Sequence, residues 1–458
     1  MQKRYNSPQA KMYVIAFLFV FAIGGIDPVA VNASQSQWTK NTYLSTSSVV
    51  ASIDGCIPLP PDYVCEEIPR IKLKYQAQKN SREFERIKIK IGVDAFPCEK
   101  EVCYVNLGPT SNEGARIEFW AVQKGNVQTD HYWLKYRVLD ISPPDNPAKA
   151  AWKVEIISLR LINSEAPDYY HIWDMLPPLT NIPAWLRTPR VVDALATQNL
   201  YYYLSAKLIQ FKLADPGDCP AGGVNLNGYA TACGMEKTKE EVYSWQNRFD
   251  RSILRVARQT EVPAQLLKNF FARESQFWPA DYGEVAEYGI GHITEPGADT
   301  LLLWNPNYYR EICHMYAGDS SPYCINGFGE LEETHQAALR GIVLDQASAY
   351  CPECPTKLYL EDIERNIRVF AWALQAKAAQ AGQIVHNVTG KPPSLVSSYE
   401  DMWKFTLINY NVGPNCLYNS LKAVWGAGNP LTWENTAPQI KDFCGRSVKY
   451  VNDISNNQ

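Results

Sequence analysis

The hydrophobic pattern of the chain changes its period once, and this change constrains the fold more than any other feature. Over about residues 84–165, apolar residues alternate with polar ones, as at Ile87 and Ile89. This alternation is typical of half-buried strands. In the last half of the chain, apolar residues recur every three or four positions, as at Phe249 and Ile253, which indicates helices. The sequence therefore predicts a multidomain chain, in which a mainly-β domain of sandwich or barrel type precedes an all-α domain.

Composition shifts set the expected domain limits. Residues 34–83 are rich in Ser, Thr and Pro and predict an irregular lead-in. The β-rich domain is expected over 84–213, closed by a helical stretch near 190–212. A segment rich in Gly, Pro and Asn predicts a linker loop over 214–235. The helical domain then covers 236–458.

The N-terminus has the features of a secretory signal peptide. Basic residues, among them Lys3 and Lys11, precede an apolar run from Met12 to Ile26, and Val31-Asn32-Ala33 offers a cleavage site. The run is short for a bilayer span of about 20 residues. Residues 1–33 are therefore predicted to be a signal peptide, and the protein is expected to be secreted or held in the cell envelope. An uncleaved membrane anchor is the alternative.

Twelve cysteines agree with export, since disulfides persist in oxidising compartments. They fall into local pairs: Cys56/Cys65, Cys98/Cys103, Cys219/Cys233, Cys313/Cys324, Cys351/Cys354 and Cys416/Cys444. We expect each pair to close one loop, although spacing alone does not fix connectivity. Cys351 and Cys354 also have the spacing of half a zinc site.

Several functional classes are disfavoured by composition and motif. A net charge of −4 and a pI near 6.0 argue against a nucleic-acid partner. The chain has no His-Glu-x-x-His helix, Gly-x-Ser-x-Gly elbow or Gly-x4-Gly-Lys loop. Its six histidines are scattered. No metal and no organic cofactor is expected.

One acidic residue falls among apolar ones at the end of a predicted helix. Leu266, Leu267, Phe270 and Phe271 occupy one face over about 262–273, and Glu274 lies on that face, four residues after Phe270. A carboxyl group there would be partly desolvated, which raises its pKa toward the value of a general acid. The alternative is a glutamate at a helix end that points into solvent or pairs with Arg273.

Glu274-Ser275 ends the predicted helix, Gly289 to His292 follows it, and Asn409 to Pro414 lies near the end of the chain. Together these segments resemble the soluble lytic transglycosylase and goose-type lysozyme family of peptidoglycan-cleaving enzymes. Glu274-Ser275 matches the Glu-Ser pair that ends a helix in that family. Gly289 to His292 (Gly-Ile-Gly-His) resembles its glycine-rich segment, and Asn409 to Pro414 resembles its AYNAGP-like segment. Val448 to Ile454 is similar to its closing tyrosine-valine segment. The resemblance covers roughly residues 240–455.

The resemblance implies a lysozyme-like helical fold with a glycan groove and one essential carboxylate, Glu274. It implies that Ser275 orients Glu274, that Tyr410 lies near its carboxyl group, and that Gly289 to Gly291 line the groove where sugar rings approach. Where the family usually has Gln, this chain has His292. The histidine side chain can take up a proton, so this expected substrate contact is titratable. The expected substrate-binding residues are Ser275, Gly289, Gly291, His292, Tyr410 and Asn411.

In such a transglycosylase one carboxyl group acts first as acid and then as base on the MurNAc-GlcNAc β-1,4 bond of peptidoglycan. The muramyl 6-hydroxyl attacks the anomeric carbon, so the product ends in a 1,6-anhydromuramyl group. The alternative is a lysozyme-type hydrolase, which needs a second group to place water. Asp281, Glu284 and Glu287 are the candidates for that role.

Three further hypotheses remain open. Aromatic residues around the motifs could stack on sugars, although most are expected in the core; they are Trp278, Tyr282, Tyr288 and Trp304. The β-rich half has no nameable motif and could bind the wall or an envelope protein. The whole chain could also be a non-catalytic exported glycan-binding or scaffold protein, with His292 as the sign of lost turnover.

Overall fold

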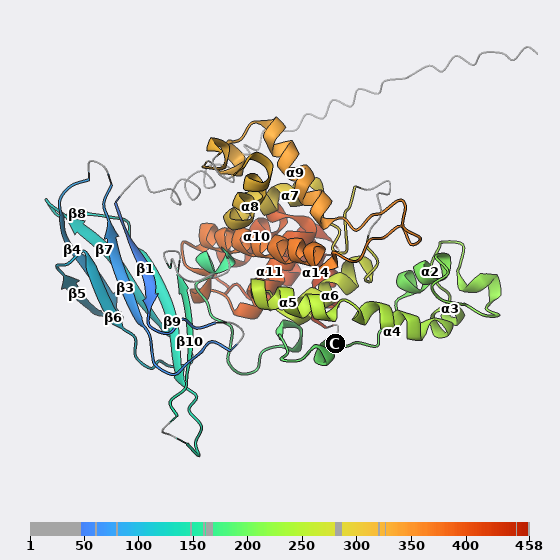
Figure 1. The fold of residues 1–458 in the computed structure, drawn as a ribbon, viewed down its shortest axis with the longest axis horizontal. Coiled ribbons are helices and arrows are strands. Elements are labelled where there is room, and N and C mark those ends of the chain that lie inside the picture. Colours follow the sequence, from blue (N-terminus) through green and yellow to red (C-terminus); the bar gives the residue numbers. More distant parts are fainter. Residues whose placement is uncertain are drawn as a thin grey trace, which may run out of the picture. The chain divides into compact units, whose positions relative to one another are not determined.

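The computed structural model describes residues 47–59, 62–78, 81–146, 149–158, 161, 168–279, 286–318, 321–325, 327–445 and 447–456. The expected signal peptide, residues 1–33, lies outside the described residues. The described elements all belong to the unit Thr46–Gln458. Within it a β-rich region is followed by a helical region, as the sequence predicts (Figure 1).

The strands form two antiparallel sheets. The first has the order β1-β3-β6 and the second the order β2-β10-β9-β7-β4-β5, with β8 pairing β7. The strands are β1 (Ser48–Asp54), β2 (Val64–Cys65), β3 (Arg70–Gln76), β4 (Phe84–Ile91), β5 (Asp94–Cys98), β6 (Val102–Asn106), β7 (Ala115–Gln123), β8 (Val127–Gln128), β9 (Tyr132–Asp140) and β10 (Trp152–Ser158). Ile71 and Leu73 of the first sheet share one apolar cluster with Ile89, Phe119 and Leu134 of the second. Alternating apolar side chains therefore hold the two sheets together.

The prediction of an irregular lead-in over 34–83 is wrong where the structure describes it, because β1, β2 and β3 lie in this segment. In β3, Ile71, Leu73 and Tyr75 are buried and alternate with lysines. This is the same period-two signal that marks the later strands. The Ser- and Pro-rich residues beside these short strands obscure the alternating pattern in the sequence.

The expected helix near 190–212 is split into a 3-10 turn, η3 (Val192–Leu195), and α2 (Tyr202–Gln210). Side chains of α4 hold the residues between them out of a helix. Asn247 bonds both the backbone N–H and the C=O of Thr197, and the Thr197 hydroxyl donates to Gln246. Tertiary hydrogen bonds thus override local helix preference here.

The region expected to be a linker loop, 214–235, is also partly ordered into elements. It contains the turn η4 (Pro220–Gly223) and the start of α3 (Ala232–Lys237), and the Cys219–Cys233 disulfide closes it. The helical core begins earlier than predicted. Tyr169 and Trp173, placed in the β-rich domain by the sequence, belong to the core cluster of the helices.

In the part of the chain that the structure describes, eleven α-helices follow from α4 onward, with short 3-10 turns between some of them. They are α4 (Lys239–Asn247), α5 (Asp250–Thr260), α6 (Ala264–Ser275), α7 (Glu295–Trp304), α8 (Pro306–Ala317), α9 (Glu333–Ala347), α10 (Ile363–Thr389), α11 (Tyr399–Val412), α12 (Pro414–Gly426), α13 (Trp433–Cys444) and α14 (Ser447–Ser455). Helix α10 is central and contacts α5, α7, α9, α11 and α12 (Figure 1). A Cβ atom on Gly382 would clash with Trp173, whose Nε1 donates to Ala378 O at 2.8 Å. Small residues on α10 therefore let the segment after the sheets pack closely against it.

All six predicted cysteine pairs are confirmed as disulfides, including Cys351–Cys354, for which half a zinc site was the alternative. Cys56, just after β1 of the first sheet, bonds Cys65 in β2 of the second sheet. Cys98 in β5 of the second sheet bonds Cys103 in β6 of the first. This disulfide content points to an oxidising, extracellular environment. Among the residues that the structure describes, no helix combines the length and the apolar character needed to cross a membrane.

Candidate active site

Glu274 lies in the last turn of α6, and the residues after it fix where that helix ends. Gln276 and Phe277 have φ values of 49° and 63°, in the left-handed region that stops a helix. The side chain of Gln276 accepts a hydrogen bond from Tyr203 N at 2.8 Å, and Phe277 O accepts one from Trp245 Nε1 at 2.9 Å. The helix end is thus held by α2 and α4, which gives Glu274 a defined position.

The carboxyl group of Glu274 is largely buried, with 14% of its side chain exposed. Burial raises its pKa from 4.5 to about 7, while the Tyr450 hydroxyl and the Arg273 charge oppose the rise and Glu287 adds to it. Desolvation dominates because it penalises the charged form of the group. The position of Glu274 on the apolar face of α6 accounts for this burial.

Tyr450 of α14 donates a hydrogen bond from its hydroxyl to Glu274 Oε1. Its side chain is buried, and burial together with the Glu274 charge raises its pKa well above 10. Helix α14 is tied to α6 where Asn269 Nδ2 donates to Ile454 O at 2.8 Å. The sequence singles out the segment around Tyr450 but assigns it no role, because its contact with Glu274 joins residues far apart in the chain.

Tyr410, the tyrosine expected beside Glu274, makes its hydrogen bond elsewhere. Its hydroxyl donates to Gly291 O at 2.9 Å, and its ring meets Phe270 edge-on. The Glu274 charge still raises the pKa of Tyr410, second to burial, so the two groups interact through space. Tyr410 therefore supports the glycine-rich loop rather than bonding the carboxyl group.

The two glycines of this loop are buried against the core. Gly289 has a φ of 73°, and a Cβ atom there would overlap Ala347 O; a Cβ atom on Gly291 would overlap the Phe370 ring. Both positions therefore need glycine for packing, and Gly289 needs it for its backbone conformation as well. This differs from the expected reason, the close approach of a sugar ring.

Ser275 is also buried, with 2% of its surface exposed. Its hydroxyl donates to Ile290 O at 2.7 Å. The structure thus places Ser275 as a tie between the end of α6 and the glycine-rich loop. It shows no bond from Ser275 to Glu274, so any orienting effect on the carboxyl group acts through the backbone.

His292 lies between two carboxyl groups. Its Nδ1 atom is 3.9 Å from Glu274 Oε2 and 3.5 Å from Glu287 Oε2. Burial lowers the pKa of His292, and the Glu287 charge opposes that change. Its φ of 59° is left-handed, a conformation that histidine adopts more readily than bulky residues. The structure thus brings His292 and Glu287 to the carboxyl group that the helix pattern predicts.

The remaining predicted residues are less central. Asn411 is exposed at the end of α11. Asp281, Tyr282 and Glu284 lie outside the described residues. Trp278 is 1% exposed and stacks between Trp245 and Phe211, so it is a core residue rather than a sugar platform. The other two aromatics, Tyr288 and Trp304, are partly buried and pack against the helical core.

In the part of the chain that the structure describes, no group of three or more His, Cys, Asp or Glu side chains could hold a metal ion. Comparisons with protein-family models, with curated proteins and with solved structures find no match to this chain. The resemblance to lytic transglycosylases therefore rests on the sequence motifs.

Proposed function

We propose that this protein is an exported lytic transglycosylase that cleaves the MurNAc-GlcNAc β-1,4 bond of peptidoglycan and leaves 1,6-anhydromuramyl ends. The observation that carries the proposal is the Glu274 carboxyl group, buried at a fixed helix end with a pKa of about 7. At neutral pH about half of this group is protonated, which suits a residue that must both give and take a proton.

The proposed reaction uses Glu274 twice. The protonated carboxyl group donates its proton to the glycosidic oxygen as the bond from that oxygen to the anomeric carbon breaks. The carboxylate then accepts the proton of the muramyl 6-hydroxyl, whose oxygen bonds to the anomeric carbon. The enzyme ends protonated, as it began, and no water is consumed. Tyr450 holds the carboxyl group in place through both steps.

A second candidate function is favoured by the position of Glu287 and His292. Glu287 has 39% of its side chain exposed and lies 3.5 Å from His292 Nδ1, which also faces Glu274. This pair could hold a water molecule for attack on the anomeric carbon, which would make the protein a lysozyme-type hydrolase. We favour the transglycosylase, because one buried carboxyl group with a raised pKa supplies every step that it needs.

The variant Glu274→Gln tests the catalytic role. Gln has nearly the same shape but releases no proton, so cleavage of purified sacculi is expected to fall by about 100- to 10,000-fold. The matched control is Glu434→Gln, an exposed position on α13, which is expected to cleave at the wild-type rate. Near-normal turnover in Glu274→Gln would contradict the proposal. It would show that another group is the general acid, whereas absence of cleavage by the wild-type protein itself would support a glycan-binding or scaffold protein.

A further inference from the structure

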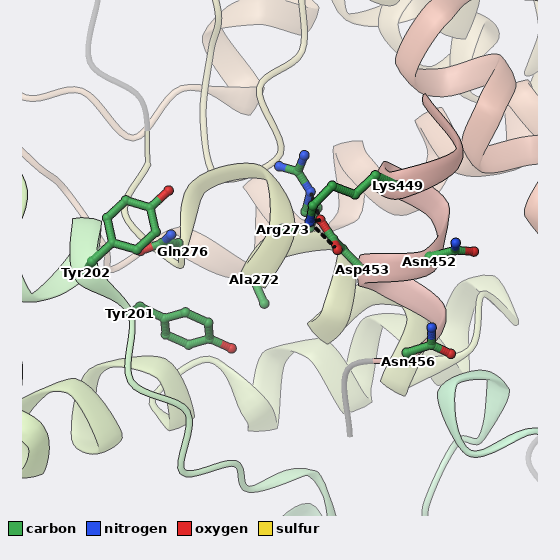
Figure 2. A pocket seen from close by; sticks show the side chains of 9 residues that line it. All are labelled: Tyr201, Tyr202, Ala272, Arg273, Gln276, Lys449, Asn452, Asp453 and Asn456. Atoms are coloured by element: carbon green, nitrogen blue, oxygen red, sulfur yellow. Dashed lines mark hydrogen bonds and ion pairs between the residues drawn. The ribbon is translucent and has the colours of Figure 1, made fainter. Parts of the chain in front are cut away.

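A hollow of about 610 Å³ lies beside the end of α6, between α14 and the start of α2. We call it the α2–α14 pocket; its lining includes Tyr201, Tyr202, Arg273, Gln276, Lys449 and Asn452. Figure 2 shows the two tyrosines on one side of the hollow and the α14 side chains on the other. Its volume is in the range of sites for small ligands.

The pocket is separate from the candidate active site. Ala272, which also lines it, precedes Glu274 by two positions on α6. Successive residues of an α-helix point about 100° apart, so Ala272 faces about 200° away from Glu274. The pocket therefore opens on the other face of α6, and the reaction proposed at Glu274 gives it no role. Its tyrosine wall comes from residues before 240, outside the part of the chain that resembles the transglycosylase family.

The charged groups of the pocket favour an anion. Arg273 Nε lies 3.1 Å from Asp453 Oδ2, and Lys449 Nζ lies 2.7 Å from Asp453 Oδ1 (Figure 2). One carboxylate thus faces two cations, which leaves a net charge of +1. None of the residues described accepts a hydrogen bond from the terminal nitrogens of Arg273, so these can bind an incoming carboxylate side by side. A neutral ligand would leave the excess charge unmatched.

The polar groups around these cations offer more donors than acceptors. Lys449 bonds both oxygens of Asp453, at 2.7 and 2.8 Å. Gln276 Oε1 accepts hydrogen bonds from Tyr203 N and Leu204 N, which leaves the amide N–H₂ group as a donor. The two asparagines of α14 add one donor group and one acceptor group each. A peptide brings a backbone N–H with each residue and needs matching acceptors, whereas the oxygens of a sugar all accept hydrogen bonds. The donor excess therefore favours a sugar over a peptide.

An aromatic wall completes the pocket. Tyr202 is 48% exposed, and its ring meets Tyr229 edge-on with 5.0 Å between the ring centres. Tyr201 is half-buried beside it and packs against Phe277. Because these contacts fix the rings, little conformational entropy is lost when the apolar C–H face of a sugar packs against them.

We propose that the α2–α14 pocket is a second, non-catalytic glycan site that binds an acidic sugar. Arg273 and Lys449 hold the sugar carboxylate, and Tyr202 covers the apolar face of the ring. The Gln276 amide donates to a sugar hydroxyl. The ligand class is a hexuronate, either free or as one unit of an anionic glycan. This inference goes beyond the proposed function and does not depend on it, because it needs no sugar at Glu274.

Binding of methyl β-D-glucuronide and of methyl β-D-glucoside to the full chain, measured by ligand-detected NMR, tests this inference. The two probes differ only at C6, which is a carboxylate in one and a hydroxymethyl group in the other. Neither contains the bond that the proposed reaction cleaves. The glucuronide is expected to bind about tenfold more tightly, because only its carboxylate can pair with the two cations.

Three variants locate the binding. Lys449→Glu makes the net charge of the pocket −1 and is expected to abolish the preference for the glucuronide. Lys449 is changed rather than Arg273 because the Arg273 charge also lowers the pKa of Glu274. Lys422→Glu, the same change at an exposed site on α12, is expected to keep the preference. Glu274→Gln is expected to keep it as well, because Glu274 lies on the other face of α6.

Four results would overturn the inference. The first is equal affinity for the two probes, or a preference that survives Lys449→Glu. The second is displacement of the glucuronide by acetate at equal concentration, which would identify a general anion site. The third is binding of N-acetyl-dialanine as tight as that of the glucuronide, which would identify a peptide site. The fourth is loss of the preference in Glu274→Gln, which would place the glucuronide in the candidate active site.

Discussion

At the scale of single residues, opposing contributions set the pKa of the Glu274 carboxyl group. Burial raises its pKa, whereas the hydrogen bond from Tyr450 and the charge of Arg273 lower it, and the result is about 7. Each opposing contribution comes from a named side chain. Changing one of these side chains should therefore move the pKa of Glu274 in a known direction.

Tyr450→Phe removes the hydrogen bond that stabilises the ionised carboxylate, so the pKa of Glu274 should rise above about 7. Because the first step needs the protonated form, the alkaline limb of the kcat/KM profile should shift to higher pH. Tyr410→Phe is the matched control, since it loses a bond to Gly291 O and not to Glu274. An alkaline limb that stays in place in Tyr450→Phe would show that Glu274 is not the acid.

The raised pKa of Glu274 should also make the free energy of unfolding depend on pH. The folded-state pKa of Glu274, about 7, exceeds its ordinary value of 4.5, so the folded protein binds this proton more tightly than the unfolded chain. That contribution is complete below about pH 4.5 and is lost as pH rises through 7. Relative to wild type, Glu274→Gln should gain about 2 to 4 kcal/mol of unfolding free energy between pH 4.5 and 8.5. Denaturant unfolding at both pH values measures this gain, and no change with pH would contradict the pKa.

At the scale of elements, the site is built where α6, α14 and the glycine-rich loop meet. Ser275 ties α6 to the loop through Ile290 O, and Tyr410 of α11 bonds the same loop at Gly291 O. Gly291 lets that loop lie directly against the rings of Phe270 and Phe370. The loop position, and with it that of His292, thus depends on the absence of a side chain at Gly291.

Gly291→Ala should therefore destabilise the fold by about 1 to 3 kcal/mol, the usual cost of overpacking a core, and should lower activity. Gly341→Ala on α9 is the control, because a Cβ atom there meets nothing within 4 Å. It should stabilise the protein by up to about 1 kcal/mol, since alanine favours helix more than glycine does. Equal unfolding free energies for the two variants would contradict the packing argument.

Features that depend on a local sequence pattern could be predicted, whereas features that depend on contacts between distant residues could not. The helical face that carries Glu274 is a local pattern, so α6 and the raised pKa could be predicted. The bond from Tyr450 could not, because it joins residues 176 positions apart. The break between η3 and α2 also depends on distant partners, Gln246 and Asn247. The alternation of apolar and polar residues in β3 is a local pattern and could be predicted, but the Ser- and Pro-rich residues around it favour an irregular segment.

At the scale of the whole molecule, disulfides reinforce both the β-rich and the helical regions. Two of the six bonds lie among the strands and four in the rest of the chain. The longest closed loop, between Cys416 and Cys444, spans 28 positions and links the start of α12 to the end of α13. Each bond stabilises the fold mainly by restricting the unfolded chain.

If all six bonds form, the intact mass of the protein purified without reductant should be lower by two hydrogens per bond than that of the reduced protein. Thiol labelling without reductant should be near zero. Reduction should lower the melting temperature, because each lost bond typically costs 2 to 4 kcal/mol. Substantial labelling of Cys351 and Cys354 that disappears on addition of zinc would contradict the disulfide there and support a metal site.

The fate of the cleaved bond distinguishes a transglycosylase from a hydrolase, and digestion of purified sacculi in heavy-oxygen water reveals it. Internal attack by the muramyl 6-hydroxyl takes no oxygen from solvent. We therefore expect the released muropeptides to have 1,6-anhydromuramyl ends, which are one water lighter than hydrolysed ends and free of the heavy label. Reducing ends that carry the heavy oxygen as the main product would contradict it. That result would identify a lysozyme-type hydrolase, with Glu287 and His292 as the groups that place the water.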